Sequence, residues 1–117
     1  KNGELGLREI FKKFPLGDGR PDGAAVDIEG CYWTAMFDGY RISRISLEGD
    51  ILEEHILPVR CPTMVCFGGE DMKTLYITTT RQNMDESELA KNPLSGSLFS
   101  IRTKIPGMIK PNFIEKK

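Results

Sequence analysis

Short runs of β-favouring residues, separated by glycines, set the hydrophobic pattern of this chain. Glycines recur at positions 23, 30, 39 and 49, at intervals of 7, 9 and 10 residues. The runs that they separate cover residues 24–28, 32–37, 40–47 and 51–57. Asp38-Gly39 and Glu48-Gly49-Asp50 are turn sequences, which favour hairpins between successive strands. We therefore predict four short antiparallel strands that form a meander.

The second and third runs differ in regularity. Over residues 31–38 the side chains alternate, so that Trp33 shares one face with Cys31 and Phe37, and we expect Trp33 to pack between neighbouring sheets. In the third run, Ile42 and Ile45 do not fall on the same face. This irregularity predicts a bulge or a local twist there.

The pattern then repeats, because Pro21-Asp22-Gly23 aligns with Pro62-Thr63-Met64 at an offset of 41 residues. Units of about 40 to 50 residues with four strands each are typical of β-propeller blades. We predict an all-β fold with about two such blades, both within one propeller domain. The predicted parts are a trailing strand of an earlier blade (1–16), one blade (21–58) and a last blade (62–114) with strands over 62–67, 74–80, 96–103 and 112–114.

One segment breaks the β pattern. Asp85 and Glu88 have the spacing of a capping box, and Pro93 ends the helical run that follows. We predict a short helix in a loop of the last blade, with Glu86, Glu88 and Lys91 on its solvated face. Two blades do not bury their faces alone, and propellers close with roughly four to eight. We therefore expect this chain to need further N-terminal blades or further copies of itself.

Composition and charge exclude several classes of protein. The 117 residues are 39% hydrophobic and 28% charged, with a net charge of −1, which fits a folded domain without a nucleic-acid footprint. No apolar run approaches the roughly 20 residues of a membrane span, and the first residues carry no signal-peptide core. The three cysteines include no C-x-x-C pair, so we predict buried, reduced thiols in a cytoplasmic protein.

Few residues offer site chemistry. His55 is the sole histidine, which excludes a multi-histidine zinc site, and we predict that it is solvated or caps the outer strand. Asp18, Asp22, Asp27 and Glu29 lie close together but do not match a calcium-binding EF-hand loop. We expect most of them to form turns or to be solvated. Asp22 stands at the entry of a strand expected to line the central channel, so it is either a site residue or an Asp-Gly turn residue.

Nearly the whole chain, from Gly3 to Phe113, resembles one enzyme family. Four segments carry the resemblance, and it is their combination that is specific. The segments are PDGAAVDIEGCYWTAMFDG, RISRISLEGDILEEHILPV, CPTMVCFGGEDMKTLYITTTR and NPLSGSLFSI. They resemble the C-terminal part of sugar lactonases of the regucalcin (senescence marker protein), gluconolactonase and luciferin-regenerating-enzyme family. The resemblance implies a six-bladed propeller. It also implies one divalent metal ion (Ca²⁺, Zn²⁺, Mn²⁺ or Mg²⁺) held by a Glu, an Asn and the Asp of the PDG motif.

That aspartate corresponds to Asp22, which the resemblance makes both a metal ligand and the catalytic acid/base residue. The family's Glu and Asn correspond to positions before Lys1, so one copy of this chain would not complete the site. The implied reaction is metal-dependent hydrolysis of a sugar lactone to the aldonic acid. Two alternatives stay open, namely a non-catalytic calcium-binding protein like regucalcin and a phosphotriesterase or esterase on the same scaffold.

Overall fold

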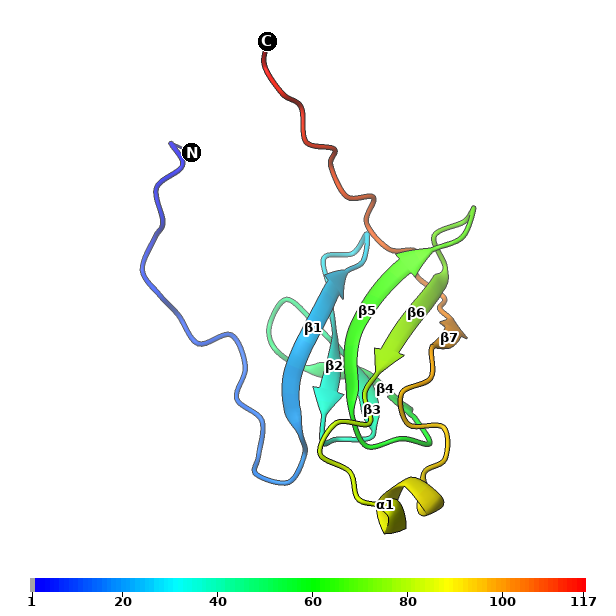
Figure 1. The fold of residues 1–117 in the computed structure, drawn as a ribbon. Helices are drawn as coiled ribbons and strands as arrows, with labels where there is room; N and C mark the ends of the chain where they lie inside the picture. The colour runs from blue at the N-terminus through cyan, green and yellow to red at the C-terminus, as the bar shows by residue number, and fades with distance from the viewer. Residues whose placement is uncertain (1) are drawn as a thin grey trace.

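Two antiparallel β-sheets lie face to face in the computed structural model, which describes residues 2–117 (Figure 1). The first sheet has four strands in the order of the chain, β1-β2-β3-β4. They are β1 (Arg20–Val26), β2 (Tyr32–Phe37), β3 (Arg41–Ile45) and β4 (Ile51–Ile56). The predicted meander is confirmed, and the predicted irregularity appears as a register shift between Arg44 and Ile45.

The second sheet has three strands rather than the predicted four. Its order is β5-β6-β7, with β5 (Pro62–Gly68), β6 (Thr74–Thr79) and β7 (Phe99–Arg102). The prediction of a strand over residues 112–114 is wrong for this structure. After β7 the chain crosses to the first sheet, where Ile28 N–H donates to Pro106 O and Met108 N–H donates to Val26 O, both at 3.0 Å. The following residues extend away from both sheets (Figure 1).

The hydrophobic core fills the space between the two sheets. Trp33 of β2 is 1% exposed and meets Phe67 of β5 edge-on, with ring centroids 5.7 Å apart. Packing of Trp33 between neighbouring sheets is thus confirmed. The buried cluster consists of Trp33, Ala35, Ile42, Leu57, Val59, Val65, Phe67, Leu75 and Ile77.

The opposite face of the first sheet is also covered. Thr34 and Met36 of β2 are fully buried although they point away from β5. The N-terminal segment reaches this face at Tyr32, where the Phe11 ring meets the Tyr32 ring edge-on with centroids 6.1 Å apart. Residues 2–16 form no strand in this structure, and Lys1 lies outside the described residues. Their assignment to an earlier blade stays a prediction.

The short helix α1 (Glu86–Lys91) forms where the capping sequence predicts it. The Asp85 carboxylate accepts a hydrogen bond from Glu88 N–H at 2.8 Å, as a helix N-cap does. Glu88 is not on a solvated face, contrary to prediction, because its carboxylate pairs with Arg60. In the part of the chain that the structure describes, no helix has the length and apolar character needed to cross a membrane.

Candidate functional site

Asp22 lies in a β-bulge of strand β1. Pro21 pairs with Met36 and Ala24 pairs with Thr34, so Asp22 and Gly23 together face a single residue, Ala35. A bulge bends a strand and re-aims the side chain that it carries. Strand β5 shifts its register at the equivalent position of the repeat, between Pro62 and Met64. The 41-residue repeat therefore includes the bulge, with Thr63 where the first sheet has Asp22.

Gly23 allows the two bulged strands to approach each other. Strands β1 and β5, each the first strand of its sheet, run side by side (Figure 1). A Cβ atom at Gly23 would lie 2.8 Å from the carbonyl oxygen of Thr63 and would also overlap the Met64 side chain. Only glycine fits this approach, which explains why the residue after Asp22 carries no side chain.

The Asp22 carboxylate is exposed and accepts no hydrogen bond or ion pair from residues 2–117. It borders a shallow hollow of about 340 Å³ that is also lined by Arg20, Pro21 and Phe37. An aspartate in an Asp-Gly turn usually bonds its own backbone. Because Asp22 does not, its oxygens are available to a ligand.

A free carboxylate is a suitable ligand for a hard divalent cation. Asp22 fits this role in charge, exposure and lack of a competing partner. Within the described residues, no group of three or more His, Cys, Asp or Glu side chains is arranged to hold a metal ion. In residues 2–117, Asp22 is therefore not joined by two further His, Cys, Asp or Glu side chains in such an arrangement.

A cluster of paired charges stands beside this end of β1. The Asp38 carboxylate accepts hydrogen bonds from Arg20 at 3.0 Å and Arg60 at 2.6 Å. Arg60 also forms two hydrogen bonds with Glu88 of α1, at 2.5 and 3.1 Å. Burial alone would raise the pKa of Asp38, but hydrogen bonds from Cys61 and Arg20 and the charge of Arg60 lower it below its ordinary value. Asp38 is thus ionised and paired.

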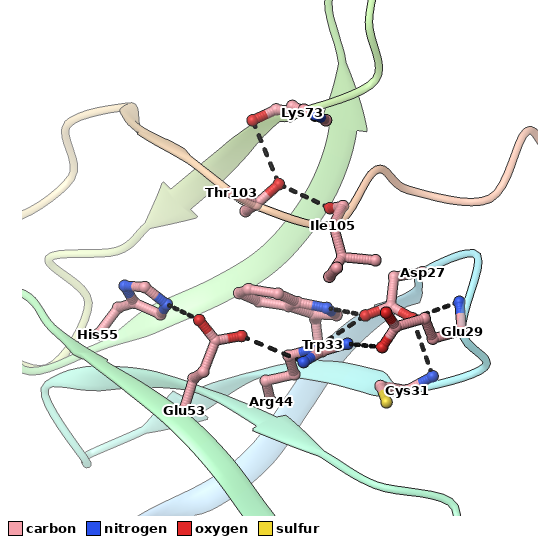
Figure 2. A network of polar contacts seen from close by, with 10 residues as sticks. All are labelled: Asp27, Glu29, Cys31, Trp33, Arg44, Glu53, His55, Lys73, Thr103 and Ile105. Atoms are coloured by element: carbon pink, nitrogen blue, oxygen red, sulfur yellow. Dashed lines mark hydrogen bonds and ion pairs between the residues drawn. The ribbon is translucent and has the colours of Figure 1, made fainter.

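The opposite end of β1 holds a second aspartate, Asp27, which is completely buried (Figure 2). One carboxylate oxygen accepts from the backbone N–H groups of Glu29 and Cys31, at 2.9 and 3.0 Å. The other accepts from Trp33 Nε1 at 2.9 Å and Arg44 Nε at 2.8 Å. Burial would raise the pKa of Asp27, yet the hydrogen bonds from Trp33, Arg44 and Cys31 outweigh it and lower the pKa.

The prediction that Asp27 forms a turn or is solvated is therefore incomplete. Its two backbone bonds do hold the turn after β1, but its side chain also ties three strands of the sheet together. The sequence pattern did not predict this network. Arg44, the one charged residue among the four buried positions of β3, was the available signal, because a buried guanidinium requires a carboxylate partner.

His55 and Glu53 extend the network across the sheet (Figure 2). The His55 ring stacks on Trp33 with centroids 5.6 Å apart and an interplanar angle of 22°. Its Nε2 atom lies 3.8 Å from Glu53, which also pairs with Arg44 at 3.4 Å. The prediction of a solvated or capping histidine is confirmed only in part, because the side chain is 30% exposed while its ring packs on the core tryptophan.

The cysteines are all free, but only Cys31 and Cys61 are buried. Burial raises the pKa of both thiols. Cys66 is exposed, contrary to prediction, because its side chain points from β5 away from the core. It lines an apolar groove of about 460 Å³ between the ends of β1 and β5 and the segment at Met108.

Comparison with known proteins gives the family directly. The sequence model of the SMP-30/Gluconolactonase/LRE-like region matches residues 1–81. The chain belongs to this family, as the resemblance of its motifs predicted.

Two curated relatives illustrate the similarity. The chain is 52% identical over 114 residues to a 6-deoxy-6-sulfogluconolactonase from Pseudomonas putida, covering 97% of this chain and 39% of the relative. It is 39% identical over 102 residues to regucalcin from Danio rerio, covering 86% of this chain and 35% of the relative. The chain thus spans between a third and two fifths of the length of these relatives.

Solved structures agree with the fold. A calcium-binding protein, regucalcin, from Agrobacterium tumefaciens matches 91% of this chain with a TM-score of 0.85 and 26% identity, over 36% of its own length. A luciferin-regenerating enzyme matches 79% of this chain with a TM-score of 0.68 and 32% identity, over 31% of its own length. The two sheets are therefore propeller blades, which confirms the predicted fold class.

Proposed function

We propose that the whole protein containing this chain hydrolyses sugar lactones to aldonic acids, with Asp22 as a metal ligand and the acid/base residue. The observation that carries the proposal is the exposed Asp22 carboxylate, which no described residue binds, on the bulge of a first blade strand. A relative with 52% identity is named a 6-deoxy-6-sulfogluconolactonase, which favours a lactone as the substrate class.

The chemistry assigned to Asp22 is the one that the family resemblance implies, and the exposed, unpaired carboxylate supports it. A divalent metal ion bound there would polarise the lactone carbonyl. One oxygen of Asp22 would bind that ion, and the carboxylate would take a proton from the attacking water molecule. Asp22 would then return the proton to the ring oxygen as the ester bond breaks, giving one carboxylic acid and one hydroxyl group. Water is consumed and the aspartate is regenerated.

The proposed assembly is a six-bladed propeller with Asp22 at the mouth of its central channel. Blades supplied by a longer chain, or by further copies, would cover the remaining open faces and contribute the other metal ligands. Three free thiols fit a reducing compartment, so we also propose a cytoplasmic location.

A second candidate is calcium binding without catalysis. One structural neighbour is described as a calcium-binding protein, and Asp22 has oxygen ligands of the type that Ca²⁺ prefers. Under this alternative, Asp22 would bind the ion, and no lactone would be opened.

The test uses a full-length protein, made either from the gene that encodes this chain or by placing residues 1–117 into the P. putida relative. Proton release is measured with D-glucono-1,5-lactone, an arabinonolactone, 6-deoxy-6-sulfogluconolactone and a phosphotriester, with Mn²⁺, Ca²⁺ or no added metal. We expect metal-dependent opening of at least one lactone and none of the phosphotriester. Metal binding without any lactone opening would instead support the calcium-binding candidate.

Matched variants separate Asp22 from aspartates in general. Asp22→Asn removes the charge, and we expect it to lower kcat about 100-fold to 10,000-fold, the range typical of a lost acid/base group. Asp50→Asn is the control, because Asp50 is also exposed in the first blade and its side chain holds no described partner. Equal activity of both variants would overturn the assignment of Asp22.

A further inference from the structure

Arg20 is a cation with spare hydrogen-bond donors in the same hollow as Asp22. Its side chain is 73% exposed, and its guanidinium lies 5.2 Å from the Phe37 ring centroid. Within residues 2–117 it makes one hydrogen bond, from Nη2 to Asp38. A guanidinium carries five N–H donors in a planar fork, so most of the donors of Arg20 face solvent.

Asp38, the one hydrogen-bond partner of Arg20, also has other donors. Arg60 already holds Asp38 at 2.6 Å, and the Cys61 thiol donates to the same oxygen at 3.4 Å. Arg60 also forms an ion pair with Glu88, so its guanidinium binds two carboxylates. Of the two guanidinium groups at Asp38, only Arg20 can therefore turn to a ligand without leaving a carboxylate unpaired.

Arg20 also stands between two adjoining hollows. One is the hollow of about 340 Å³ that contains Asp22. The other has about 490 Å³ and is lined by Lys12 and Asp38 among others, with Arg20 and Pro21 shared by both. A small molecule whose carbonyl group faces Asp22 thus has adjoining space bordered by two cations, Arg20 and Lys12.

We infer that Arg20 is a specificity-determining residue that binds an anionic substituent, a sulfonate or a phosphate, on the sugar lactone opened at Asp22. This inference rests on the proposed function. A planar guanidinium matches the oxygens of such groups with two parallel hydrogen bonds, whereas a lysine offers only a point charge. Lys12 adds positive charge to the same space.

The test compares substrates in the full-length protein. The variants are Arg20→Gln and Arg20→Lys, and kcat/KM is measured for 6-deoxy-6-sulfogluconolactone, 6-phosphogluconolactone and D-glucono-1,5-lactone. The measured quantity is the substrate ratio, which is kcat/KM for an anionic lactone divided by kcat/KM for the uncharged lactone. We expect Arg20→Gln to lower this ratio about 10-fold to 100-fold for one anionic lactone, as loss of a charged hydrogen bond does. The loss should appear mainly in KM, and Arg20→Lys should restore part of it.

Arg102→Gln is the matched control, because Arg102 is also an exposed arginine paired with one aspartate, Asp71. It should leave the substrate ratio unchanged. The anionic lactone whose ratio falls in Arg20→Gln identifies the substituent as sulfonate or phosphate. An equal loss on all three lactones, or no loss, overturns the inference while lactone hydrolysis stands. If the parent protein opens no lactone, the proposed function fails instead.

Discussion

Asp22 in strand β1 and Asp27 directly after that strand have opposite environments. Asp27 is fully buried at the end of β1 and accepts four hydrogen bonds, two from the backbone and two from side chains. Asp22 is exposed in the bulge near the start of β1 and accepts none from the described residues. The two carboxylates are five residues apart in sequence and have the same intrinsic chemistry.

The difference shows that burial and hydrogen bonding decide whether a carboxylate stabilises the fold or is free to bind a ligand. A buried carboxylate must be matched by donors, and once matched it is held rigidly and has no lone pair left for a ligand. An exposed carboxylate without partners contributes little to folding but keeps its oxygens free. We therefore expect changes at Asp27 to alter stability and changes at Asp22 to alter activity.

The largest effect on stability is expected at Asp27. In Asp27→Ala, the Arg44 guanidinium and the Trp33 indole N–H lose their shared acceptor inside the sheet. Removing one member of a buried ion pair typically costs about 3 to 5 kcal/mol in the free energy of unfolding. Urea denaturation of the full-length protein measures this loss. A change below about 1 kcal/mol, the scale of an exposed ion pair, would contradict the structural role of Asp27.

A smaller loss of stability is expected at Gly23. In Gly23→Val, the added side chain would meet the Thr63 carbonyl and the Met64 side chain where β1 passes β5. Overpacking of this kind costs about 1 to 3 kcal/mol. Combining Gly23→Val with Met64→Ala should recover part of the loss, because only the backbone contact would remain. Full recovery would show that the strand approach itself imposes no requirement for glycine.

Acid should remove the contribution of Asp27 to the stability of the folded state. The folded-state pKa of Asp27 lies below the ordinary aspartate value of 3.8, so its contribution to stability is present above that value. This contribution is lost as the pH falls through the lowered pKa. Thermal unfolding between pH 6 and about 3 should therefore show a smaller acid-induced drop in Tm for Asp27→Asn than for the wild type. Equal drops in both proteins would contradict the assignment.

The smallest effect is expected at an exposed ion pair. The Arg102 guanidinium bonds to the Asp71 carboxylate and lowers the pKa of Asp71 to about 2. Both groups are solvated, and exposed pairs add little to stability. Arg102→Gln should leave the urea midpoint unchanged. A loss as large as that of Asp27→Ala would show that exposure does not separate the two kinds of ion pair.

The fold was largely predictable because strands and turns follow local rules. Glycine spacing and alternation predicted the first sheet, and the capping box predicted α1. The absence of a fourth strand from the second sheet was not predictable in this way. Residues 106–108 form backbone hydrogen bonds to the end of β1 and to the loop before β6. These contacts join segments that are distant in sequence, so a local sequence pattern does not predict them.

The candidate site was predictable only in part. The repeat placed Asp22 at the start of a first strand, and the family resemblance gave it a role. The bulge and the approach of β5 at Gly23 depend on contacts between distant segments. The Asp27 network and the stacking of His55 on Trp33 likewise require three strands in register, so residue types alone did not identify them.

The most direct test of this account is lactone opening by Asp22→Asn in the full-length protein, at a temperature where urea denaturation shows that the variant is folded. The account predicts a loss of kcat of about 100-fold or more, with the free energy of unfolding within about 0.5 kcal/mol of the wild type. Activity close to that of the wild type in the folded variant would contradict the assignment of Asp22 as the catalytic carboxylate.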